Sequence, residues 1–107
     1  MLLLNAINRS SGGLNMQKRF TAMVPQSVLT KLGWSNPAIW AEVFDFLLER
    51  RLLVSISRAY SYTEECFIDG YDWAADYYDI DDSMVGYART WERAAEEAVV
   101  KCLEVLS

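Results

Sequence analysis

The chain has 107 residues and a formal net charge of −5, and 52% of its residues are hydrophobic. This composition is too apolar for a disordered chain, and the length suits one domain with one core. The sequence contains no histidine, which excludes Ser–His and Cys–His nucleophiles, histidine general bases and histidine metal ligands, and no apolar run approaches the roughly 20 residues of a membrane span.

The first fifteen residues contain a mainly polar stretch, residues 5–13, and show no hydrophobic period. They predict a flexible tail over residues 1–15, followed by a single domain over residues 16–107. The opening apolar run from Met1 to Leu4 contains no basic n-region and ends at Asn5, so a signal peptide is not expected. Cys66 and Cys102 lie among apolar neighbours, which predicts two small core residues and a reducing cytoplasm.

A short strand and a short helix are predicted next. Phe20 to Val24 has the composition of a strand, and Pro25 opens a helix over Gln26 to Leu32. Gly33 follows where a left-handed cap residue is needed, so the helix should end there.

The central element is a helix over residues 36–51. Asn36 and Pro37 are typical of a helix start, because Asn accepts from the first-turn amides and Pro lacks an amide. Its apolar residues cover more than half of the circumference, which predicts a helix buried from two sides. They are Ile39, Trp40, Val43, Phe44, Phe46, Leu47 and Leu48.

The chain then changes to a strand period. The apolar residues Leu52, Val54 and Ile56 alternate with Leu53, Ser55 and Ser57. This two-residue period predicts a half-buried strand. A turn at residues 59–62 and a returning strand from Thr63 to Asp69, ended by Gly70, should follow. Residues 70–88 fit two interpretations, a third strand around residues 76–80 or an ordered loop held by its aromatic residues.

Thr90 is the expected cap of a final helix over residues 91–106, with alanines on one face and charged residues on the other. The predicted fold class is therefore α+β. It comprises a short helix, a buried central helix, a small antiparallel sheet (a hairpin or three strands) and a C-terminal amphipathic helix.

Three segments resemble a known group of proteins. They are Phe20-Thr21-Ala22-Met23-Val24-Pro25, Ala41-Glu42-Val43-Phe44-Asp45-Phe46-Leu47, and Thr90-Trp91-Glu92-Arg93-Ala94-Ala95. The chain is similar over residues 18–106 to small α+β proteins of gut Bacteroides and their phages or mobile elements, with departures at Phe46 and Arg93. The function of that group is unknown, so the resemblance implies a fold and carries over no catalytic residue.

Enzymatic sites are not predicted. A calcium loop starting at Asp79 requires Gly at its sixth position and Glu at its twelfth, where this chain has Met84 and Thr90. No pair of carboxylates is placed in a recognisable pocket, and the adjacent acids are expected to be surface charges. We therefore expect no metal, no cofactor and no catalytic residues.

Two kinds of binding remain. The predicted order of a short helix, a glycine turn, a second helix and a hairpin is also that of a winged helix-turn-helix. Its recognition helix, however, would turn Glu42, Asp45 and Glu49 towards the DNA phosphates. Between Arg58 and Arg89 there are eight acidic residues and no basic one. This acidic segment also carries aromatic residues, which are enriched at protein interfaces.

The predicted interaction surface consists of Trp73, Tyr77, Tyr78, Asp79, Asp81 and Asp82. The alternative is that its aromatic residues only cover the core. The predicted function is a non-enzymatic cytoplasmic accessory protein that binds another protein. A DNA-binding (winged-helix-like) or DNA-mimicking regulator of a phage or mobile element is the alternative.

Overall fold

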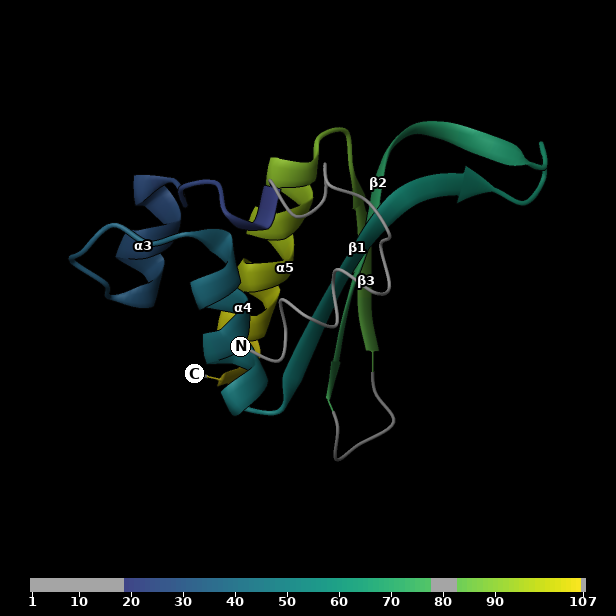
Figure 1. Ribbon diagram of the computed structural model, residues 1–107. Coiled ribbons are helices and arrows are strands. Elements are labelled where there is room, and N and C mark those ends of the chain that lie inside the picture. Colours follow the sequence, from purple (N-terminus) through teal and green to yellow (C-terminus); the bar gives the residue numbers. More distant parts are fainter. Residues whose placement is uncertain (1–18, 78–82, 107) are drawn as a thin grey trace. The chain divides into compact units, whose positions relative to one another are not determined.

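A computed structural model describes residues 19–77 and 83–106 and has an α+β fold (Figure 1). The chain divides into two compact units at Arg50 and Arg51, and each is described by itself. The predicted tail, residues 1–15, lies outside the described residues. No helix in the described ranges combines the length and the apolar character that a membrane span requires.

The first helix of unit 1 is α3, Gln26–Leu32, and the sequence prediction for it is confirmed. Val28 and Leu29 are its buried residues. Gly33 follows with φ of 75°, a left-handed conformation that glycine adopts without the steric cost of a Cβ atom. The N–H of Gly33 donates to the carbonyl of Thr30, and this bond closes the helix.

The second helix is α4, Trp40–Glu49, and its predicted start at Asn36 and Pro37 is wrong. The chain before it is extended, because Ile39 forms an isolated antiparallel bridge with Met23. Val24 donates its N–H to Ala38, and Trp40 donates to Ala22. The carboxylate of Glu42 accepts the N–H of Ile39 and so stabilises the delayed helix start. The predicted strand from Phe20 to Val24 is reduced to this one bridge.

Aromatic residues fix the packing inside unit 1. The rings of Phe20 and Phe44 meet edge to face with centroids 5.2 Å apart. Trp34 packs edge-on against Phe46 with ring centroids 5.3 Å apart, and the Arg50 guanidinium lies over the Phe46 ring, 3.7 Å from its centroid. The buried residues of α4 are Trp40, Ala41, Val43, Phe44 and Leu47, whereas Phe46 and Leu48, which the sequence also predicts to be covered, are half-buried.

Unit 2 contains the sheet, whose strands are β1 (Leu52–Ser61), β2 (Cys66–Tyr77) and β3 (Ser83–Ala88). They are antiparallel in the order β1-β2-β3. Ile56 lies opposite Trp73, which in turn lies opposite Gly86, so these positions share one face. The last helix, α5 (Trp91–Leu106), lies along that face (Figure 1).

Helix α5 confirms the prediction for residues 91–106. The hydroxyl oxygen of Thr90 accepts the N–H of Arg93, which is the expected cap. The alanine face is buried, and the indole N–H of Trp73 donates to the Glu97 carboxylate at 3.2 Å. This bond links the helix to the inner face of the sheet.

Unit 2 also corrects five predictions. The turn lies at residues 62–65 and not at 59–62, and the returning strand begins at Cys66. Strand β2 continues through Gly70 to Tyr77, and the third strand is residues 83–88. Cys66 is exposed, whereas Cys102 is buried as predicted.

Candidate functional site

The hairpin of β1 and β2 is longer than the rest of the sheet. The last pair between β2 and β3 is Tyr71 with Ala88, and Tyr71 also pairs with Arg58 on β1. Beyond this row the two strands continue as a two-stranded ribbon past the end of β3 (Figure 1). We call residues 58–69 the hairpin end.

Three aromatic residues occupy one face of the hairpin end. Tyr60 lies directly opposite Phe67 on the neighbouring strand, with ring centroids 5.1 Å apart and rings at 82°. Tyr62 also packs edge to face against Tyr60, with ring centroids 5.1 Å apart. Solvent still reaches 87% of Tyr62 and 64% of Phe67. The rings therefore order one another without being covered.

Charged groups surround this aromatic cluster. The Arg58 guanidinium lies 5.9 Å from the centroid of Phe67, at the outer limit of a cation–π contact. The turn exposes Glu64 and Glu65, and the N–H of Glu64 donates to the Ser61 hydroxyl oxygen. Exposed Asp69 lies on the returning strand. With one cation and three carboxylates, the hairpin end is acidic.

A bulge positions the hairpin end relative to the sheet. The pairing register changes between Arg58 and Tyr60, and Gly70 on the other strand has φ of 106°. The Tyr87 hydroxyl of β3 donates to the Asp69 carbonyl at 2.6 Å, and its ring covers Gly70. Bulges bend and twist a ribbon, so this contact sets the angle at which the ribbon leaves the sheet.

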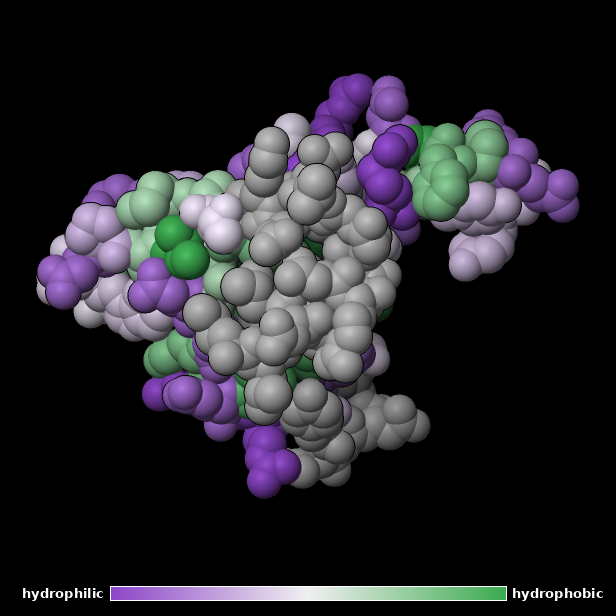
Figure 2. Space-filling view, viewed as in Figure 1, coloured by the Kyte–Doolittle hydropathy of each residue, from purple (hydrophilic) through white to green (hydrophobic). Residues whose placement is uncertain are grey.

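Apolar and charged side chains lie side by side on the surface of the hairpin end. Figure 2 shows hydrophobic residues there, next to strongly hydrophilic ones. Of the described large hydrophobic residues that are exposed, Tyr60, Tyr62, Phe67 and Ile68 belong to the hairpin end. This is the densest group of exposed apolar side chains along the described chain.

The predicted interaction surface is divided by the structure. Trp73 is 5% exposed, faces α5 and bonds Glu97, so it belongs to the core of unit 2. Tyr77 is half-buried at the end of β2, opposite Leu52. Tyr78, Asp79, Asp81 and Asp82 lie outside the described residues. For Trp73 the structure favours the alternative that an aromatic residue covers the core.

The sequence prediction misses the hairpin end because it places a turn at residues 59–62. A signal for the strand is nevertheless present in the sequence. The large residues Arg58, Tyr60 and Tyr62 alternate with the small residues Ala59 and Ser61. This two-residue period is typical of a strand with large side chains on one face and small ones on the other.

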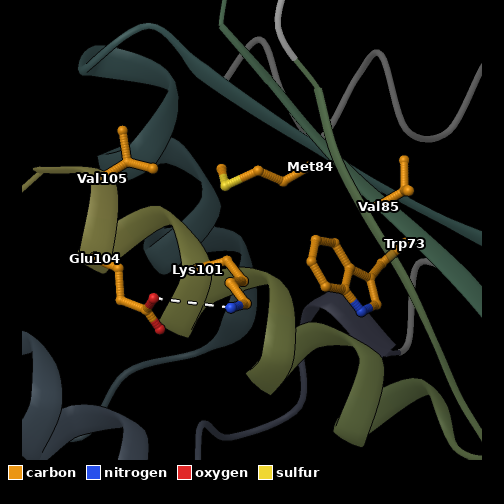
Figure 3. A pocket seen from close by; sticks show the side chains of 6 residues that line it. All are labelled: Trp73, Met84, Val85, Lys101, Glu104 and Val105. Atoms are coloured by element: carbon orange, nitrogen blue, oxygen red, sulfur yellow. Dashed lines mark ion pairs between the residues drawn. The ribbon is translucent and has the colours of Figure 1, made fainter.

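Two of the hollows formed by the described residues lie on the sheet. One, of about 430 Å³, lies between β3 and α5 and is lined by Trp73, Met84, Val85, Lys101, Glu104 and Val105 (Figure 3). The other lies on the outer face, over Ser55, Ser57 and Ala74. Neither contains a nucleophile paired with a base. Among the described residues no group of three or more Cys, Asp or Glu is close enough to hold a metal ion.

Comparison with known proteins gives no relative: no protein-family model, no curated protein and no solved structure matches this chain.

Proposed function

We propose that this chain is a non-enzymatic cytoplasmic accessory protein that acts by binding another protein through its hairpin end. The observation that carries the proposal is the exposed cluster of Tyr60, Tyr62 and Phe67 on a two-stranded ribbon. Exposed aromatic side chains grouped together mark interaction sites, and buried aromatics supply much of the free energy of protein binding.

The mutual packing of the rings also favours binding. Cross-strand contacts already restrict Tyr60 and Phe67, so less side-chain entropy is lost when a partner covers them. A ribbon of two strands presents both rings and the turn to a concave partner surface. We expect the partner to offer an apolar recess that takes Tyr62 and Phe67.

The charges of the hairpin end indicate that the rim of the partner's recess is basic. Glu64, Glu65 and Asp69 outnumber Arg58 at the hairpin end, so basic groups on the partner would steer the encounter and pair with the turn. The same charges oppose a grip on the phosphates of a nucleic acid, which requires a basic surface.

The alternative is a DNA-binding or DNA-mimicking regulator of a phage or mobile element. Its support is the order of the elements, because α3, the Gly33 turn, α4 and a hairpin follow one another as in a winged helix-turn-helix. The exposed polar residues of α4 include Glu42 and Glu49, which would repel phosphates. A mimic would instead use carboxylates to occupy a basic nucleic-acid-binding protein.

The test compares capture by three forms of the tagged full chain. These are the unchanged protein, the double variant Tyr62→Ser/Phe67→Ser, and Met23→Ser as a matched loss of an exposed apolar side chain in unit 1. Each is incubated with nuclease-treated lysate of the source organism at low and high salt. We expect one protein to be captured by the unchanged chain and by Met23→Ser, and to be lost from the double variant.

Each contrary result has a definite meaning. Equal capture by all three forms would place the contact outside the hairpin end and overturn the proposal. A gel shift of duplex DNA with a steep salt dependence would favour the DNA-binding alternative. Capture of a basic protein that survives the double variant but is lost at high salt would favour the mimic.

A further inference from the structure

We infer that β3 is a self-pairing edge: two copies of this chain join β3 to β3 in antiparallel fashion and form one continuous sheet. Strand β3 pairs with β2 and, among the residues described, with no other strand. Its outer edge therefore presents backbone N–H and C=O groups at every second residue. This inference concerns a surface separate from the hairpin end and does not depend on the proposed function.

The composition of β3 supports a covered edge. Exposed edge strands are usually protected by lysine, proline or an inward charge, and Ser83–Ala88 contains none of these. Val85 is 73% exposed and Tyr87 is 47% exposed. A strand of this kind pairs readily with another strand.

The side chains of β3 are complementary to those of a second β3. A two-fold axis at Gly86 places inner residues opposite inner residues, with Met84 of one copy facing Ala88 of the other. On the outer face it places Val85 opposite Tyr87 of the second copy, twice. Aromatic residues opposite β-branched residues are stabilising cross-strand pairs.

The charges at the two ends of β3 are complementary as well. At the start of the strand, the Ser83 hydroxyl donates to the Asp76 carboxylate of β2. At its end, exposed Arg89 follows Ala88. The same axis brings Arg89 beside Ser83 of the second copy. Asp76 of the second copy pairs with that Ser83, so it lies two strand spacings of about 4.8 Å from Arg89. An arginine side chain spans that distance, and the symmetry gives two such pairs.

The hollow between β3 and α5 suits an added strand. It lies between the first half of β3 and the C-terminal part of α5, and Figure 3 shows Met84 extending from the strand towards the helix. By the same register, Ala88 of the second copy faces Met84 and would lie at the edge of this space. The Lys101–Glu104 ion pair, 3.8 Å long and exposed, lies on the helix side of the hollow.

The test is the mass of the full chain in solution, measured by sedimentation equilibrium. We expect a species of twice the 12.3 kDa chain mass at micromolar concentration. Val85→Lys should shift it to the monomer, because lysine on an edge blocks strand addition. Ser55→Lys, on the exposed face of β1, is the matched control and should remain a dimer. Circular dichroism verifies that both variants are folded.

A second measurement locates the contact. In a Cys66→Ser background, the double variant Val85→Cys/Tyr87→Cys should form disulfides between copies on mild oxidation, whereas Ser55→Cys/Ser57→Cys should not. A monomer at all concentrations overturns the inference. So does a dimer that Val85→Lys leaves intact, because its interface lies elsewhere. A monomer that binds a peptide of another protein along β3 would reassign the edge to a foreign strand.

Discussion

At the scale of single residues, the two cysteines have opposite environments. Cys102 is buried in α5, and burial raises the pKa of its thiol from 9.0 to about 11, because the thiolate is poorly solvated there. Cys66 is exposed at the hairpin end, opposite Ser61. Since the thiolate is the reactive form, the two thiols should differ in reactivity with a water-soluble alkylating agent.

We predict that iodoacetamide at about pH 8 modifies Cys66 alone in the folded protein. Unfolding in guanidinium should add modification at Cys102, which peptide mass spectrometry would identify. The folded pKa of Cys102 lies above its unfolded value, so protection by protonation persists below pH 9 and weakens as pH rises towards 11. Rapid alkylation of Cys102 in the folded chain at about pH 8 would contradict its burial.

At the scale of elements, the bulge between β1 and β2 is the feature that directs the hairpin end. The Tyr87 ring covers Gly70, and its hydroxyl holds the Asp69 carbonyl. A Cβ atom at Gly70 would collide with the Tyr87 ring, and φ of 106° is strained for any residue with a side chain.

Gly70→Ala should lower the free energy of unfolding by about 1–3 kcal/mol, the usual cost of a strained backbone position. Tyr87→Phe keeps the ring and removes the hydrogen bond, so it should cost only about 0.5–1.5 kcal/mol. Urea unfolding gives both values. In Gly70→Ala, amide hydrogen exchange should become faster in residues 58–70 and change less in α5. An unchanged stability of Gly70→Ala would contradict the strain at this position and the close contact of Gly70 with the Tyr87 ring.

The elements also differ in how far the sequence specifies them. Helix α3 with Gly33, and α5 with Thr90, are predicted within a residue, because their start and stop signals act through local hydrogen bonds. The predicted start of α4 is wrong because a distant segment, Met23, pairs with Ile39 and keeps residues before Trp40 extended. Such non-local pairing leaves no periodic signal.

The predicted strand end at Gly70 is wrong for a similar reason. Glycine breaks many strands, but here it occupies a bulge inside β2, and the strand continues because β1 and β3 both pair with residues 71–76. Trp73 of the predicted interaction surface is a core residue for a related reason. Strand alternation does not say which face is covered, and Trp73 lies on the face that α5 covers.

At the scale of the whole molecule, unit 2 has two separate surfaces, the hairpin end and the edge of β3 with which no other described strand pairs. Self-pairing through β3 would give an assembly with two hairpin ends. Two linked sites bind a repeated or dimeric partner more tightly than one site, by raising the effective concentration of the second contact. Different variants test the two proposals. Tyr62→Ser/Phe67→Ser tests partner binding by the hairpin end, and Val85→Lys tests self-pairing through β3.

The central claim is that the hairpin end touches another protein directly, and site-specific photo-crosslinking tests it most directly. A photoreactive phenylalanine derivative replaces Tyr62, or Ser27 on the exposed side of α3 as the control, in cells of the source organism. We predict one dominant protein adduct from position 62, absent from position 27 and weakened by Phe67→Ser. The same adducts from both positions, or none from position 62, would contradict the claim.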